Sequence, residues 1–296
     1  MIKDFFNKLT GKYGSTNIQP GGISRLTAAY LDCRCEYIPA GSESGEIAEM
    51  FDAAVAEGKE QGYYPVLIVT NEGNLAHSFY DNARLNQALE GNVNYEDGVI
   101  TVKEDFALNE EHLQALRDYR AKLLAEWNEN DAAHFIQQRI EESTEYDDEF
   151  DLEEEWGGED EGITFEDIHQ GIWAPFDYDT KKSYELLLAK IPVSEPWQIA
   201  AWLPMGNWNE CPAPKDLLAM AKRWYDRYGA VICCMSSDEL EFRVSNPPTD
   251  FSEAYELAKE QYYFCQDRIE QYAGGYNLQT LANGLTKSPY WYFWWD

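Results

Sequence analysis

The sequence predicts an α+β fold in which a mixed or antiparallel sheet is flanked by helices. Three observations support this prediction. Apolar residues recur at helical spacing from Ser44 to Gln61. Residues 64–69 form a β-branched run that is typical of a buried strand. Residues 239–244 alternate between charged and apolar side chains, as in a strand with one face in water.

The first part of the chain contains two well-marked helices. The helix over 44–61 should end at Gly62, because glycine readily adopts the left-handed conformation at a helix end. Asn109 is placed to cap a second helix, with Glu110 and Glu111 in its first turn. A short strand is expected at 33–39, and a further helix at about 131–142.

The last part of the chain gives the clearest pattern of elements. Pro214 and Gly229 are typical of the start and the end of a helix, and Asp250 with Glu253 predicts the start of another. A fourth helix is expected around 278–285. Strands are expected at 197–203, 231–235, 239–244 and 290–296.

Composition divides the chain into three predicted parts. Residues 1–140 form an N-terminal α/β lobe, and residues 183–296 form a C-terminal α+β domain. Between them, residues 141–182 are expected to be a partly disordered linker, since 13 of the 21 residues from 141 to 161 are acidic and none is basic. A calcium loop is a weaker alternative, because the acidic residues lack the EF-hand spacing.

A weak internal repeat suggests two related lobes. Residues 58–68 and 225–232 both have the order helix, glycine, strand. Because such joints are common, this similarity is only a hypothesis about the halves of the chain.

The charge of the chain restricts its partners. The 54 acidic and 23 basic residues give a net charge of −31. Such a surface repels phosphate backbones and anionic membranes, so nucleic-acid and membrane partners are not expected. It attracts basic proteins and increases their rate of encounter, although the acidity can also serve solubility alone. No apolar run of about 20 residues and no signal peptide is evident, so a cytoplasmic location is expected.

No catalytic, metal or cofactor motif stands out. The six cysteines form no C-x-x-C pair, and buried thiols are the simplest interpretation. A phosphate loop, a dinucleotide-binding glycine motif and an H-E-x-x-H motif are all missing. We therefore predict no metal site and no cofactor, and catalytic residues stay unassigned.

Nine residues are candidates for a binding site. They combine amides, carboxylates, indoles and a thiol, and most follow predicted strands or helices, where functional groups often concentrate. They are Asn207, Trp208, Asn209, Glu210, Cys211, Gln261, Asp267, Trp294 and Asp296. The alternative is that the asparagines brace a rigid loop and that the thiol and indoles pack in a core. Asp296 needs a cationic or backbone partner, such as Arg243.

Five ordered motifs in the last part resemble the bacterial domain-of-unknown-function family 4253. They are residues 207–212, residues 224–230, residues 240–248, residues 258–267 and residues 290–296. The chain has Gln266 where a proline is expected after Cys265, which puts the local turn in doubt. The resemblance implies no reaction, because none is established for the family.

Charge, aromatic content and the missing catalytic motifs favour a non-catalytic binding protein, immunity-like, that recognises a basic partner. The alternative is a hydrolase or transferase that uses Asp, Glu and Trp residues on a sugar-like substrate, since paired carboxylates and indoles suit sugar chemistry. A homo-oligomer also remains open.

Overall fold

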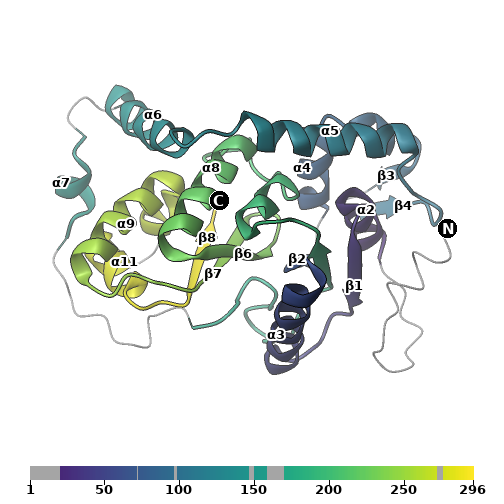
Figure 1. Cartoon of the computed structure of the whole chain (residues 1–296), viewed down its shortest axis with the longest axis horizontal. Coiled ribbons are helices and arrows are strands. Elements are labelled where there is room, and N and C mark those ends of the chain that lie inside the picture. The colour runs from purple at the N-terminus through teal and green to yellow at the C-terminus, as the bar shows by residue number, and fades with distance from the viewer. Residues whose placement is uncertain (1–20, 72, 97–98, 147–149, 159–169, 272–275) are drawn as a thin grey trace.

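The centre of the molecule is an open, mixed six-stranded sheet (Figure 1). The computed structural model describes residues 21–71, 73–96, 99–146, 150–158, 170–271 and 276–296. The sheet has the order β1-β5-β2-β6-β7-β8, and a separate hairpin joins β3 to β4. The strands are β1 (Arg34–Ile38), β2 (Tyr64–Val69), β3 (Val93–Glu96), β4 (Val99–Val102), β5 (Leu186–Ile191), β6 (Ala230–Met235), β7 (Glu239–Val244) and β8 (Tyr290–Trp294). The predicted α+β class with a mixed sheet is therefore confirmed.

The sheet combines strands from both ends of the chain. β5 runs antiparallel to both of its neighbours, β1 and β2, so it lies between two strands that precede it by more than a hundred residues. β2 and β6 form the parallel pair, with Leu67 opposite Cys234. The two segments with the repeated helix-glycine-strand order therefore meet at the middle of the sheet.

Helices cover the sheet on both faces, as Figure 1 shows. They are α2 (Gly22–Leu31), α3 (Ser44–Gln61), α4 (Asn74–Asn82), η1 (Asn86–Leu89), α5 (Glu110–Glu126), α6 (Asp131–Tyr146), α7 (Leu152–Trp156), η3 (Pro196–Ala201), α8 (Pro214–Tyr228), α9 (Phe251–Phe264), α10 (Asp267–Glu270) and α11 (Leu278–Leu285).

The predicted helix ends agree with the structure. Gly62 and Gly229 end α3 and α8 with φ angles of 75° and 60°, in the left-handed region that suits glycine. The Asn109 side chain accepts a hydrogen bond from the His112 backbone N–H at 2.8 Å, and Asp250 caps α9 in the same way.

One face of the sheet carries an aromatic core. Trp224 of α8 stacks on Phe293 of β8 with ring centroids 5.4 Å apart, and the edges of Phe242 and Phe264 complete the cluster. All four side chains are fully buried. Offset and edge-to-face contacts of this kind add to the free energy of burying the rings. The alternation of β8 therefore directs Trp291, Phe293 and Trp295 into the core.

The opposite face of the sheet is also covered, which corrects the prediction of a wet face for β7. α3 packs there on β2 and β5, and the segment around Ala174 covers β7. Glu241 is completely buried and accepts hydrogen bonds from the backbone N–H groups of Trp173 and Ala174. Alternation in a sequence reveals two faces of a strand, but it does not show that another segment covers the polar one.

The predicted strand at 197–203 is wrong. Residues 196–201 form η3, because Pro196 occupies its first turn and Glu195 and Gln198 form a capping box around it. Three strands were not predicted: β3 and β4 of the hairpin, and β5 of the large sheet, whose six residues are all buried. β5 is an apolar run interrupted only by Lys190, and this lysine is neutralised by Glu36 and Glu57.

The acidic segment contains more helix than predicted. α6 continues beyond 142 to Tyr146, and α7 follows at 152–156. Glu153 of α7 forms an ion pair with Lys259 of α9, so α7 lies against the helices that cover the aromatic core. Residues 147–149 and 159–169 lie outside the described residues. The division at 140 and 182 stays a prediction.

Candidate functional site

The loop over 206–212 has an unusual backbone that orients its polar side chains. Gly206 has a φ of 99°, and a Cβ atom there would lie 1.8 Å from the Pro212 carbonyl oxygen, so only glycine fits. Asn207 and Asn209 have φ angles of 65° and 42°. Asparagine tolerates this left-handed conformation better than most residues. The loop therefore turns successive side chains in different directions.

Arg139 of α6 connects this loop to the end of α9. Its Nη2 donates hydrogen bonds to Glu210 at 2.5 Å and to Gln266 at 3.2 Å, and its Nη1 donates to Glu142 at 3.0 Å. Its Nε donates to the Tyr263 carbonyl oxygen. Only 16% of the side chain is exposed. The planar guanidinium holds three segments together, as a single ammonium group could not.

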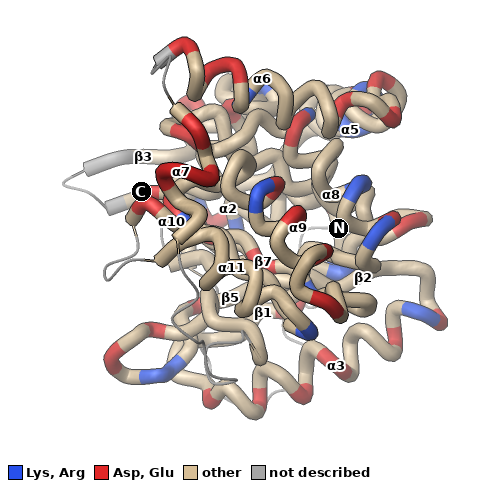
Figure 2. Tube along the Cα trace, turned by 90° about the vertical axis from the view of Figure 1, so that its left-hand side faces the viewer, with Lys and Arg blue, Asp and Glu red and all other residues tan. Residues whose placement is uncertain are grey.

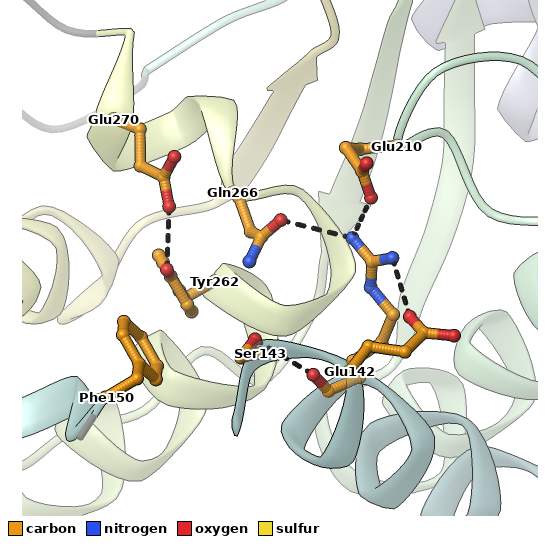
Figure 3. Close-up of a pocket in the computed structure, with 8 residues that line it drawn as sticks. Glu142, Ser143, Phe150, Glu210, Tyr262, Gln266 and Glu270 are labelled. Atoms are coloured by element: carbon orange, nitrogen blue, oxygen red, sulfur yellow. Dashed lines mark hydrogen bonds and ion pairs between the residues drawn. The ribbon is translucent and has the colours of Figure 1, made fainter. Parts of the chain in front are cut away.

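An open pocket of about 510 Å³ lies beside this arginine (Figure 3). Glu142, Glu210 and Glu270 contribute three carboxylates to its lining, and Phe150 and Tyr262 contribute aromatic surface. The Tyr262 hydroxyl donates to Glu270 at 2.7 Å. Among the described residues that line the pocket, Arg139 is the only cation, and its donors are engaged by the protein itself. The pocket is therefore acidic and has an apolar side.

A chain of hydrogen bonds lies next to the pocket. The Asn209 amide donates to the backbone oxygen of Asp296, and the backbone N–H of Asp296 donates to the Asp267 carboxylate at 2.9 Å. Three of the predicted residues, far apart in sequence, are thus brought together. The expected pairing of Asp296 with Arg243 is wrong, because Arg243 pairs with Asp52 of α3.

The predicted thiol and amide lie behind the pocket, in the core. Burial raises the pKa of Cys211 and Cys265, the latter to about 12, and the Cys265 thiol donates to the Trp294 carbonyl oxygen at 3.0 Å. A protonated thiol is a poor nucleophile, so the surroundings of both cysteines favour packing over nucleophilic chemistry. Gln261 is buried and accepts a hydrogen bond from Arg268.

The remaining predicted residues point elsewhere. Asn207 and Trp208 line a second pocket beside α4. The Trp294 indole donates to the Asp238 carboxylate at 3.1 Å, on the face of β8 opposite the aromatic core. Of the nine predicted residues, only Glu210 lines the acidic pocket.

Two carboxylates on β7, the half-buried Glu239 and the buried Glu241, have altered acidity. Burial raises the pKa of Glu239 to about 7 and that of Glu241 to about 8. Such values suit proton transfer near neutral pH. However, Glu241 is fully buried, and its two oxygens accept hydrogen bonds from backbone N–H groups. Its position fits a structural role in holding the segment around Trp173 on the sheet.

Within the described ranges, no group of three or more His, Cys, Asp or Glu side chains has an arrangement that could hold an ion. In that same part of the chain, no helix combines the length and the apolarity needed to cross a bilayer.

Arg139 and the aromatic side of the pocket were not predicted from the sequence. A signal for Arg139 was present, because it is the only lysine or arginine between Lys122 and Lys181. A single cation in so acidic a stretch is expected to form ion pairs with nearby carboxylates. Phe150, similarly, is an apolar residue within that acidic stretch, and it packs against the core.

Acidic residues are concentrated around the pocket. In Figure 2 the tube is red over most of α7 and over the C-terminal end of α6. The exposed carboxylates in this region come from α6, α7, the loop and α10: they are Glu141, Glu142, Glu145, Asp151, Glu153, Glu154, Glu155, Glu210 and Glu270.

Comparison with known proteins identifies only the C-terminal part. The model of a domain of unknown function (DUF4253) matches residues 187–296. This range includes Glu210, Tyr262 and Glu270, whereas Arg139 and Phe150 precede it. No curated protein matches the chain. No solved structure matches it either.

Proposed function

We propose that the chain is a binding protein that recognises a basic protein partner through the acidic surface around the Arg139 pocket. The observation that carries this proposal is the composition of the pocket. Three glutamates line it, while its one described cation is already engaged by Glu142, Glu210 and Gln266. An incoming lysine or arginine side chain would add charge-assisted hydrogen bonds to these carboxylates.

The aromatic side of the pocket supports a long basic side chain rather than a small cation. Phe150 and Tyr262 line the same cavity as the glutamates. Lysine and arginine bury their aliphatic stems against apolar surface while their charged ends stay near polar groups. The surrounding carboxylates of α6 and α7 would increase the rate at which a basic partner arrives.

The test is the binding of a fluorescein-labelled, lysine- and arginine-rich dodecapeptide, measured by fluorescence anisotropy at low and at high salt. The variant with Glu142→Gln, Glu210→Gln and Glu270→Gln should bind about tenfold more weakly, since three exposed ion pairs at about 0.5 kcal/mol each give this factor. A control variant with Glu49→Gln, Glu60→Gln and Glu111→Gln has the same net charge and changes exposed positions on α3 and α5.

The control variant should lose less than about threefold in affinity, and all three proteins should bind more weakly as salt screens the charges. Equal losses in the two variants would show that only overall charge matters and that the pocket is not the site. An affinity that does not change with salt would reject recognition of a basic partner. The alternative of a hydrolase or transferase stays a prediction.

A further inference from the structure

A second pocket, which shares no lining residue with the Arg139 pocket, lies between α4, η1 and the loop at Asn207. Its volume is about 660 Å³ and it is widely open. Asparagine amides are unusually frequent in its lining: Asn74, Asn82, Asn86 and Asn207 all contribute. Each amide offers one acceptor oxygen and two donor hydrogens.

The polar groups of this pocket are held in place by one another. The Asn82 amide donates to the Pro204 carbonyl oxygen at 2.6 Å and accepts from Asn207 at 2.6 Å. The Asn86 amide donates to Asp81 at 2.6 Å. The two bonds of Asn82 fix the loop to α4 at Asn207, which has a left-handed φ of 65°. Backbone strain of this kind persists where the surrounding structure enforces it, and it is concentrated at binding sites.

The charge of the pocket disfavours anions. Among the described residues, no lysine or arginine lines it, while Asp81 and Glu90 contribute carboxylates. Burial lowers the pKa of His77 below its ordinary value, which favours the neutral imidazole at pH 7. Phosphate or carboxylate groups would therefore meet repulsion without compensation.

Trp208 adds a large aromatic surface to the same pocket. Its side chain is half-buried and lines the cavity together with the amides. An indole presents an apolar ring face, whereas amides and carboxylates exchange hydrogen bonds with hydroxyl groups. A ring that has both C–H faces and many hydroxyls matches this combination.

We propose that the pocket formed by α4, η1 and Trp208 binds a neutral saccharide, with the sugar ring against the indole and its hydroxyls on the asparagine and aspartate side chains. This site is separate from the acidic pocket and does not depend on the proposed recognition of a basic partner. An open pocket that buries one face of a ligand supports weak affinity, of the order of 0.1–1 mM.

The test is isothermal titration of the full chain with maltotriose, xylotriose and the trimer of N-acetylglucosamine, and with glucose 6-phosphate as an anionic probe. At least one neutral trisaccharide should bind, whereas glucose 6-phosphate should not. Trp208→Ala should weaken the binding at least about tenfold. Trp173→Ala is the matched control, because Trp173 is 51% exposed and does not line this pocket.

A second variant separates loss of the site from loss of the fold. Asn86→Ala changes an exposed residue of η1 and should weaken the binding severalfold without changing the melting temperature. The proposal is overturned if no neutral trisaccharide binds at 10 mM, if Trp173→Ala weakens binding as much as Trp208→Ala, or if glucose 6-phosphate binds more tightly. The variant with three glutamines at the acidic pocket should keep its saccharide affinity.

Discussion

At the scale of single residues, Arg139 and Glu241 have roles that follow from burial rather than from any motif. Arg139 is useful because three acceptors from different segments converge on it. Glu241 is completely buried, and the backbone N–H groups of Trp173 and Ala174 donate hydrogen bonds to its carboxylate. It depends on two backbone N–H groups, and hydrogen bonds to buried carboxylates from such donors are individually strong.

Glu241 should make the stability of the protein depend on pH. Burial raises its folded-state pKa to about 8, while an unfolded glutamate has a pKa of about 4.3. Between these values the folded state holds the extra proton, so the free energy of unfolding falls as pH rises through this window. One such group contributes up to about 1.4 kcal/mol per pH unit.

Urea denaturation at several pH values between 5 and 8.5 measures this effect. Glu241→Gln should flatten the pH dependence, whereas Glu111→Gln, on the surface of α5, should leave it unchanged. Glu239→Gln should flatten the lower part of the window, because the pKa of Glu239 is raised to about 7. Identical pH slopes for the wild type, Glu239→Gln and Glu241→Gln would rule out this origin of the pH dependence.

At the scale of elements, helices with a clear cap were predicted, whereas α2, α4 and several strands were not. Caps such as Asn109 and Gly229 are local signals, because each depends only on the residues within one turn. β5 depends instead on distant partners, because it is a strand only where β1 and β2 lie beside it. β8 was predicted as a strand because its aromatic residues form one continuous run.

The candidate site was predicted in part for the same reason. The sequence indicated that residues 207–211, 261–267 and 294–296 carry unusual chemistry, and the structure joins Asn209, Asp267 and Asp296 by hydrogen bonds. Arg139 of α6 comes from another part of the chain, and it reaches the loop over 206–212 through a tertiary contact. No spacing within the sequence encodes such a contact.

Replacing Gly206 by a residue with a side chain should destabilise the protein. In Gly206→Ala, the positive φ costs about 1–2 kcal/mol, and the clash with the Pro212 carbonyl adds further strain. Gly41→Ala is a matched control, because Gly41 has a φ of 100° and no atom within 4 Å of the added Cβ. Thermal and urea unfolding of both variants should show the larger loss for Gly206→Ala. Equal losses would mean that the loop relaxes at no cost.

At the scale of the whole molecule, the six-stranded sheet links the two ends of the chain. β2 and β6 form its central parallel pair, and the helices that precede them, α3 and α8, pack on opposite faces. The residues matched by the family model begin inside β5, which has both of its neighbours, β1 and β2, in the N-terminal part. The hydrogen-bonded sheet therefore includes strands that lie outside the residues matched by the family model.

Residues 183–296 should not fold as an independent monomer. In that fragment β5 would lose both neighbours, and β6 would lose β2, which leaves exposed apolar strand edges that associate with other chains. Size-exclusion chromatography and proton NMR should show aggregates or a poorly dispersed spectrum. Co-expression with residues 1–182 should restore a soluble complex. A monomeric fragment with a well-dispersed spectrum and a cooperative thermal transition would contradict this prediction.

The insertion of β5 between β1 and β2 also affects how the chain is made. About 120 residues separate the end of β2 from the end of β5. At a synthesis rate of about 5–20 residues per second, the ribosome needs roughly 6–24 s to deliver the missing strand. During this interval the apolar edges of β1 and β2 have emerged without the strand that pairs with both. During this period the unpaired edges of β1 and β2 in the nascent chain are a defined binding site for chaperones.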